Sequence, residues 1–240
     1  MSIHSRRLFI TSIAILLLMQ GPYIYGQLIK TISADFSREY KEGNKKETIR
    51  GSIYYQAASK KVVIKVDYPV NQWMILKGNE TIIYYPDELR AFRIISRNPA
   101  YMPFFQAFIS ALKEDYGLTD GGYTFASYER NGNILVSYWN PPKKLTKILG
   151  QFTLKYIDNK LTYAESKNAK GKILSEAYFK NHILYGGTYF PLEISIKKKM
   201  KSSSSLEEFI LKDPQFNSSL PQEIIGFKIP KEVKVKEVKW

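Results

Sequence analysis

Residue types that support catalysis are scarce in this 240-residue chain, which has two histidines and no cysteine. A cysteine nucleophile is therefore excluded, and so is a zinc site that needs several histidine or cysteine ligands. His4 lies in a segment predicted below to be removed, so a serine-histidine-aspartate triad would depend on His182, and no G-x-S-x-G elbow is present. His182 follows Lys180 and Asn181, a pattern that predicts a solvated turn.

Acidic residues offer little more. Asp87-Glu88 and Glu114-Asp115 predict solvated turns, although carboxylate pairs of the glycosidase kind converge only in the fold and are not dismissed by spacing. The chain has no glycine-rich phosphate loop, and Asn217-Ser218-Ser219 is a common chance match to a glycosylation sequon. We therefore predict a protein that is not an enzyme and that needs no cofactor and no metal.

The first 26 residues resemble a secretory signal peptide. Arg6 and Arg7 form a positive end, Leu8 to Met19 is an apolar run too short to span a bilayer comfortably, and Gly26 is the expected cleavage point. The alternative is an uncleaved inner-membrane anchor. We predict a periplasmic product that comprises residues 27–240 as one domain.

The chain is basic, with 36 lysines and arginines against 22 acidic residues and a net charge of +14. This balance favours an anionic membrane surface, an acidic partner or nucleic acid, and export makes nucleic acid the least expected of the three. The alternative is that the charge serves solubility alone. The absence of cysteine means that the exported domain is held together by its core without disulfides, and that it is not itself lipid-anchored.

The chain between Arg50 and Arg97 predicts consecutive β-strands separated by turn residues. The gaps between them are too short for helices, so neighbouring strands should be antiparallel. Several of these strands carry apolar residues on both faces, so one face should meet the core and the other a second layer or a ligand. The predicted strands are Ile49 to Gln56, Lys61 to Asp67, Trp73 to Leu76, Thr81 to Tyr85 and Leu89 to Ile95.

Alternating residues also predict a strand over Ala34 to Lys41, and the second half of the chain is again β in pattern. Asp115 to Gly122 is predicted to be a loop, and the basic, serine-rich stretch Lys197 to Ser205 a loop between strands. The later predicted strands are Tyr123 to Glu129, Ile134 to Trp139, Phe152 to Ile157, Leu161 to Ser166, Ile173 to Phe179, Leu192 to Ile196, Phe209 to Leu211 and Ile224 to Ile229.

One segment has the period of a helix. Apolar residues recur at three- and four-residue spacing from Met102 to Leu112, which predicts an amphipathic helix with an aromatic face. The recurring residues are Met102, Phe105, Phe108, Ile109 and Leu112, with Phe104 beside them, and the aromatic face comprises Phe104, Phe105, Phe108 and Leu112.

Short motifs follow one another in a familiar order: Ala34-Asp35-Phe36, a strand containing Gly51, Asp67-Tyr68-Pro69, Leu76-Lys77-Gly78-Asn79, Ile83-Tyr84-Tyr85-Pro86-Asp87 and Phe227-Lys228-Ile229-Pro230. This order resembles the periplasmic outer-membrane lipoprotein carrier family, the LolA-like proteins. The resemblance implies a mainly β fold with a helical lid (α+β), in which a strongly curved antiparallel sheet forms an incomplete barrel closed by short helices. It also implies that acyl chains lie between the sheet and the lid.

The chain departs from the family at one informative place. Carriers of this family usually have an Arg-Pro pair before the third strand, where the arginine holds the lid closed. Here the region reads Ala58-Ser59-Lys60-Lys61, so the latch is missing or replaced by a lysine. The same fold also serves lipoprotein receptors, glycolipid carriers and envelope-stress sensors, so the resemblance does not choose among these tasks.

The residues predict three functional groups, for each of which ordinary core packing or a solvated loop is the alternative. The predicted lid consists of the four aromatic-face residues above, and the predicted basic docking patch is Lys197, Lys198, Lys199 and Lys201. The predicted lipid-binding cavity is lined by Phe36, Ile53, Tyr55, Trp73, Ile75, Tyr85 and Phe92.

Together these features predict a monomeric carrier that shuttles lipoproteins or a related lipid toward the outer membrane. The resemblance implies an inner-membrane release complex and an outer-membrane acceptor as partners. The alternative is an envelope sensor of the same fold that binds lipid or lipoprotein tails and signals to a membrane partner. Such sensors usually carry a second domain, which this chain is too short to hold, so the carrier is the favoured prediction.

Overall fold

The computed structural model of the chain describes residues 29–95, 110, 113, 115–199 and 203–239. The predicted signal peptide, the four predicted lid residues and Lys201 lie outside these ranges. No helix in the described ranges is long and apolar enough to cross a membrane.

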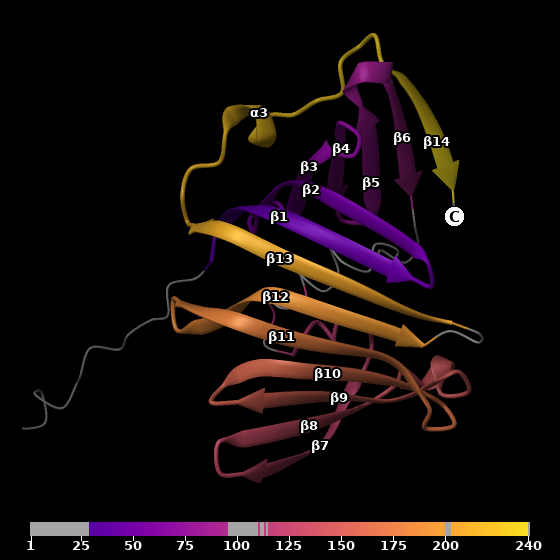
Figure 1. Ribbon diagram of the computed structural model, residues 1–240, viewed down its shortest axis with the longest axis vertical. Helices are drawn as coiled ribbons and strands as arrows, with labels where there is room; N and C mark the ends of the chain where they lie inside the picture. Colours follow the sequence, from indigo (N-terminus) through magenta and orange to yellow (C-terminus); the bar gives the residue numbers. More distant parts are fainter. Residues whose placement is uncertain (1–28, 96–109, 111–112, 114, 200–202, 240) are drawn as a thin grey trace, which may run out of the picture.

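The described residues form one 14-stranded sheet in the order β14-β6-β5-β4-β3-β2-β1-β13-β12-β11-β10-β9-β8-β7 (Figure 1). Twelve of the thirteen strand pairings are antiparallel, as the short turns between the predicted strands require, and the pairing of β14 with β6 is parallel. The strands are β1 (Thr31–Glu42), β2 (Lys45–Gln56), β3 (Lys61–Tyr68), β4 (Gln72–Lys77), β5 (Glu80–Tyr85), β6 (Arg90–Ile95), β7 (Thr124–Asn131), β8 (Ile134–Asn140), β9 (Leu149–Ile157), β10 (Lys160–Asn168), β11 (Ile173–Tyr185), β12 (Thr188–Lys199), β13 (Ser204–Phe216) and β14 (Lys234–Lys239).

The sheet is curved and open. Its order begins with β14 and ends with β7, so the two ends do not pair and the sheet does not close into a barrel. Buried side chains on its inner face form one continuous cluster that extends from Met74 of β4 to Leu154 of β9. Strands this far apart in the sheet share a cluster because the sheet bends around it. The prediction of a strongly curved, mainly β fold is thus confirmed.

The described helical elements are short. They are the 3-10 turns η1 (Pro86–Glu88) and η3 (Lys143–Leu145) and the single-turn helix α3 (Gln222–Ile225). The prediction of a lid made of helices therefore stays a prediction.

A second layer covers the outer face of β3 to β6. It is formed by α3 and the extended chain that follows it, which places Ile224 against Val63 and Ile75, and Phe227 and Val233 near Tyr84. Figure 1 shows α3 beside β3, with the chain that follows it leading to β14. This layer explains why the first strands are apolar on both faces.

The prediction of a closing strand over Ile224 to Ile229 was wrong. Ile224 and Ile225 belong to α3, and Gly226 donates its N–H to the Gln222 carbonyl at 2.9 Å to end it. The strand that ends the fold is β14, which pairs with β6 in parallel. A local sequence pattern cannot reveal this partner, because β6 ends at Ile95 and β14 begins only at Lys234.

The prediction of a solvated turn at His182 was also wrong. His182 lies within β11, opposite Pro191 of β12, and is half-buried. Its Nε2 lies 2.8 Å from the Leu161 carbonyl oxygen of β10. Burial lowers the pKa of the imidazole, against the opposing effect of that hydrogen bond. The turn that sequence reasoning placed here occurs later, at Gly186 and Gly187.

Candidate functional site

The inner face of the sheet is the candidate site, because it gathers apolar side chains from both halves of the chain. Phe36 of β1 stacks on Phe209 of β13 with ring centroids 5.5 Å apart. Ile53 of β2 is fully buried beside them, and Tyr55 packs against the same cluster. Three of the predicted cavity residues, Phe36, Ile53 and Tyr55, therefore lie together on this face.

Tyr85 and Phe92 lie on the same face, nearer the edge of the sheet. Strand register carries the face from Ile64 through Met74 and Ile83 to Phe92. The Tyr85 and Phe92 rings meet edge to face at 6.2 Å. The Arg90 guanidinium lies over both rings, 5.1 and 5.5 Å from their centroids. These two rings extend the inner apolar surface toward β6.

Trp73 and Ile75 do not share this surface, so all seven predicted residues cannot line one cavity. Both side chains alternate to the outer face of β4 and pack under the C-terminal layer, Trp73 on Phe227 and Ile75 in the cluster of Ile224. The predicted lining did not include Met74, which the pleat places on the inner face between them.

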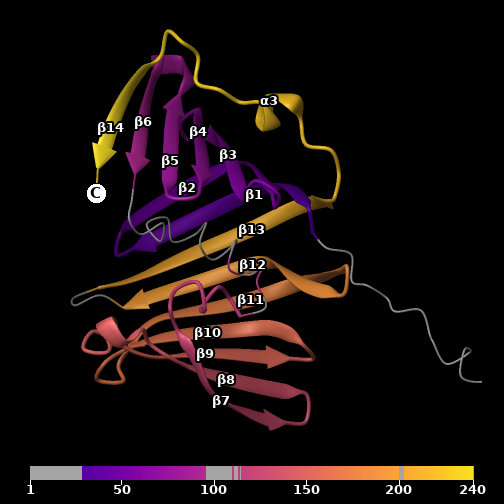
Figure 2. The ribbon, with the colours of Figure 1, turned by 180° about the vertical axis from the view of Figure 1, so that it is seen from behind.

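An aromatic turn covers the inner face over β9 to β11. Tyr116 lies 5.6 Å from Phe179 and 6.1 Å from Phe152, and Tyr123 lies 5.8 Å from Phe152, as centroid distances. Leu118 is buried in the main cluster. Figure 2 shows this segment in front of the sheet. The predicted loop over Asp115 to Gly122 is thus packed against the sheet, and the sequence signal for this was Tyr116 within the loop and Tyr123 directly after it.

Asp115 organises this cover rather than a catalytic pair. Its carboxylate accepts the N–H groups of Gly117 and Thr119 at 2.8 and 2.9 Å. Burial alone would raise the pKa of Asp115, but these hydrogen bonds and one from the Thr119 side chain outweigh it and lower the pKa. Tyr116 adopts φ +56°, and burial raises the pKa of its hydroxyl.

A groove of about 400 Å³ opens on the inner face between β2, β3 and β4. Ile49, Val66 and Met74 form its apolar floor, and the exposed side chains of Tyr68 and Val70 form one wall. The Tyr116 cover contacts β9 to β11 on the other side of the cluster, so the groove and the cover occupy different halves of the inner face.

A buried ion pair bounds the apolar inner face at its far end. Arg38 Nε lies 2.5 Å from Glu207 Oε1, and Lys198 Nζ lies 3.8 Å from Glu207 Oε2. The Glu207 side chain is only 4% exposed. Partners in β1, β12 and β13 therefore neutralise a carboxylate that would otherwise be costly to bury.

The predicted basic patch is part of a strand. Lys197, Lys198 and Lys199 lie in β12, and Ser204 and Ser205 lie in β13, so the prediction of a loop from Lys197 to Ser205 was wrong at both ends. Lys197 Nζ lies 5.3 Å from the centre of the Tyr178 ring. Alternation along the strand sends Lys197 to the outer face and Lys198 to the inner face.

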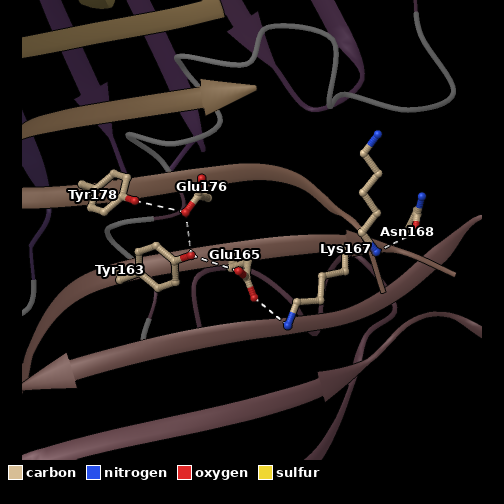
Figure 3. Close-up of polar contacts among 7 residues, drawn as sticks. Tyr163, Glu165, Lys167, Asn168, Glu176 and Tyr178 are labelled. Carbon is tan, nitrogen blue, oxygen red and sulfur yellow. Dashed lines mark hydrogen bonds and ion pairs between the residues drawn. The ribbon is translucent and has the colours of Figure 1, made fainter. Parts of the chain in front are cut away.

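The outer face of β10 and β11 is polar and closed by its own contacts (Figure 3). Glu165 and Glu176 lie opposite each other, and the Tyr163 hydroxyl lies 3.0 and 3.1 Å from their carboxylates. Tyr178 donates to Glu176 at 3.1 Å, and Lys167 pairs with Glu165 at 2.8 Å. Burial first, and then these carboxylates, raise the pKa of Tyr163. The like charges are thus bridged within the protein.

A second groove, of about 590 Å³, crosses the outer face of β12, β13, β1 and β2. Its walls include Asp35, Glu39, Glu193 and Glu208, so it carries more charge than the inner groove, whose charged lining residues are Lys46 and Glu47. No group of three or more metal-binding side chains occurs in the part of the chain that the structure describes. An apolar ligand fits the inner face of the sheet and not this one.

Lys61 lies in the region where the resemblance implies an arginine that holds the lid closed. Its side chain makes its contacts on the outer face of the sheet and not on the inner face. Its Nζ donates to the carbonyl oxygens of Ile224 and Ile225 at 2.9 and 3.1 Å. Burial lowers the pKa of Lys61. In the described part of the chain this lysine therefore fastens α3 to the outer face of β3.

Solved structures provide the comparison. A LolA superfamily protein from Nitrosomonas europaea is similar at 14% identity and a TM-score of 0.55, over 84% of this chain and 93% of that one. A putative outer membrane lipoprotein-sorting protein domain from Vibrio parahaemolyticus is similar at 15% identity and a TM-score of 0.57, over 80% and 88%. A DUF1329 family protein from Desulfovibrio piger is similar at 15% identity and a TM-score of 0.56, over 82% and 90%.

Neither a protein-family model nor a curated protein sequence matches the chain. At these identities the structural neighbours establish the architecture and leave the ligand open. The agreement extends over four fifths or more of the chain. The chain therefore has a LolA-like fold.

Proposed function

We propose that this protein is a non-catalytic, periplasmic carrier that binds the acyl chains of lipoproteins or a related lipid on the inner face of its sheet. The observation that carries the proposal is the continuous apolar cluster of that face, which opens into the groove floored by Ile49, Val66 and Met74. The fold shared with a lipoprotein-sorting domain supports the same assignment.

Acyl chains have a physical reason to enter this site. Moving one CH₂ group from water to an apolar surface gains about 0.8 kcal/mol. An acyl chain has many such groups, so its transfer can offset the loss of the contacts that the proposed lid makes with the inner face. The proposed lining consists of Phe36, Ile53, Tyr55, Tyr85 and Phe92, joined by the floor of the groove. Phe104, Phe105, Phe108 and Leu112 are proposed as the lid, on the basis of their helical spacing.

The remaining parts of the proposal concern its setting. Export by the predicted signal peptide would place the carrier between an inner-membrane release complex and an outer-membrane acceptor. The buried Arg38–Glu207 pair would form the polar end of the site. An acyl chain would not extend past it, because contact with charged groups yields no free energy from apolar burial.

A fluorescent fatty-acyl probe tests the proposal with the mature chain. We expect saturable binding that unlabelled fatty acid displaces. Ile49→Glu places a charge on the floor of the groove and should weaken probe binding at least tenfold, because a bound acyl chain would remove water from the new carboxylate. Ile210→Glu makes the same change on the outer face, where Ile210 is 38% exposed, and should leave binding within twofold.

Two results would overturn the proposal. One is an absence of saturable probe binding by the folded parent protein. The other is an equal loss in the two variants, which would mean that the probe does not occupy the inner face. Native mass spectrometry of the protein purified from its own periplasm would then identify the bound lipid or show that none is carried.

A further inference from the structure

The turn between β8 and β9 combines positive charge with exposed aliphatic side chains. Lys143, Lys144 and Lys147 are all exposed. Between them, Leu145 is 39% exposed and Ile148 is 64% exposed, the largest value among the exposed large hydrophobic residues described. Exposed apolar side chains of this kind bury little surface within the protein, and such exposed apolar surface can mark a site that contacts a partner or a membrane.

The turn is ordered by its own hydrogen bonds. Leu145 donates its N–H to the Pro142 carbonyl at 2.7 Å, and Ile148 donates to the Leu145 carbonyl at 2.8 Å. The Thr146 hydroxyl donates to the Lys143 carbonyl at 3.2 Å. The backbone satisfies itself in this way, so the lysines and the two aliphatic side chains are presented outward from a fixed frame.

A second basic turn lies beside the first. Ala169 donates its N–H to the Ile148 carbonyl at 3.1 Å, which joins the β10–β11 turn to the β8–β9 turn. Asn168 Oδ1 accepts the N–H groups of Lys170 and Lys172, each at 2.9 Å, and both lysine side chains are exposed. Figure 1 shows both turns at the right-hand end of the sheet, where β12 also ends. We call residues 143–148 and 169–172 the basic tip.

Three acidic residues of this half of the sheet and its cover form ion pairs outside the basic tip. Glu165 pairs with Lys167 at 2.8 Å. Asp120 belongs to the turn that packs Gly122 near Pro142, and it pairs with Lys113. Glu207 is held by Arg38 and Lys198 of the neighbouring strands. The stretches 141–157 and 166–175 contain no acidic residue, and no ion pair is found for the five lysines of the basic tip among the described residues.

We infer that the basic tip docks on a membrane surface of anionic phospholipids. The lysines would contact headgroup phosphates, while Leu145 and Ile148 enter the interfacial region between them. Interleaved cationic and aliphatic side chains are the pattern of interfacial membrane segments. A nucleic acid would be matched by aromatic platforms for base stacking, and the basic tip has none.

This inference deepens the proposed function, because it names the surface by which a carrier would approach a bilayer, and to that extent rests on it. Docking and acyl binding use different parts of the molecule. The basic tip lies at the end of β8 to β11, whereas the apolar groove lies between β2 and β4. Failure of one can therefore be told from failure of the other.

Sedimentation with vesicles tests the inference. The mature chain should bind vesicles of phosphatidylcholine with about one third phosphatidylglycerol, and not vesicles of phosphatidylcholine alone. Each lysine near an anionic surface is worth about fivefold in binding. The triple variant Lys143→Gln, Lys144→Gln, Lys147→Gln should thus lose at least tenfold. Lys228→Gln, Lys231→Gln, Lys236→Gln removes the same charge elsewhere and should lose less than threefold.

The aliphatic side chains have their own control. Leu145→Ser with Ile148→Ser should weaken vesicle binding at least fivefold at fixed salt. Ile183→Ser with Leu184→Ser changes two exposed residues of another hairpin and should leave binding within twofold. All four variants should bind the acyl probe as the parent does.

The lack of cysteine permits a direct measurement of insertion. Ile148→Cys carrying an environment-sensitive NBD dye should shift its emission to the blue when anionic vesicles are added. The same dye at Leu184→Cys should not shift. Equal losses in the two lysine triples, unchanged binding of the Leu145 and Ile148 double variant, or a silent dye at position 148 would each overturn the inference. Capture of an acidic protein without vesicle binding would overturn it as well.

Discussion

Trp73 of β4 stacks on Phe227 of the C-terminal segment, with ring centroids 4.7 Å apart and an angle of 26° between the rings. The two residues are 154 positions apart in the sequence (227 − 73). Their contact determines which side of β4 belongs to the outer face of the sheet. Tyr84 lies 5.8 Å from the same phenylalanine ring. Through these contacts the C-terminal segment completes a second core that is separate from the inner apolar face.

The second core should contribute stability without affecting ligand binding. Ile224→Ala removes a side chain that is 1% exposed and should lower the free energy of unfolding by about 2–5 kcal/mol. Its neighbour Ile225 is 41% exposed, so Ile225→Ala should change the free energy by less than about 0.5 kcal/mol. Urea unfolding measures both values. Equal values, or a loss of acyl binding by folded Ile224→Ala, would contradict the separation of the two cores.

Gly51 should not tolerate a side chain. A Cβ atom there would lie 1.9 Å from the Lys65 carbonyl oxygen, a backbone atom of the paired strand. The β2–β3 register shifts between Arg50 and Gly51, so the two backbones approach closely at this point. Gly51→Ala should destabilise the protein by about 3 kcal/mol or more, beyond ordinary overpacking, because backbone must move.

Gly226→Ala is the comparison for this prediction. A Cβ atom at position 226 would lie 3.2 Å from the Gln222 carbonyl oxygen, a contact that a shift of a few tenths of an ångström relieves. In thermal unfolding, the midpoint temperature of Gly51→Ala should be well below that of Gly226→Ala. The reverse order would show that β2 and β3 can separate at Gly51 at little cost.

The buried pair of Arg38 and Glu207 should behave as a unit. Glu207→Ala leaves the Arg38 guanidinium buried without its carboxylate and should cost about 3–5 kcal/mol. Replacing both, as Arg38→Met with Glu207→Leu, should cost much less and can be neutral, because neither buried charge is then left and the remaining lysine, Lys198, is 35% exposed and reaches water. A double variant as unstable as Glu207→Ala would show that the loss comes from packing and not from charge.

His182 should make stability depend on pH. Burial lowers its pKa in the folded protein from the ordinary value of about 6.5, so the unfolded chain binds more protons on this group. The contribution of His182 is therefore full above pH 6.5 and is lost as pH falls through the lower folded pKa.

Urea midpoints between pH 7.5 and 5 measure this dependence. They should fall with pH in the parent and fall less in His182→Gln, since His182 is the one histidine of residues 27–240. An equal fall in the two proteins would assign the dependence to the carboxylates.

The sequence by itself determined most of the strands. Alternation predicted strands over Ala34 to Lys41, Tyr123 to Glu129 and Ile134 to Trp139, and β1, β7 and β8 lie there. Strands of this kind are set by local chemistry, because a left-handed or polar turn and a two-residue period are properties of a few adjacent residues. The short motifs also indicated the LolA-like fold, which the structural neighbours share.

Only the tertiary structure decided what each face of a strand meets. Tyr55 and Trp73 look equally suited to a cavity in the sequence, yet one packs on the inner cluster and the other under Phe227. The same holds for Arg38 and Glu207, which are 169 positions apart, and for the two basic turns joined by Ala169 and Ile148. A residue period shows that a strand has two faces, but which segment covers each face depends on the path of the whole chain through the curved sheet.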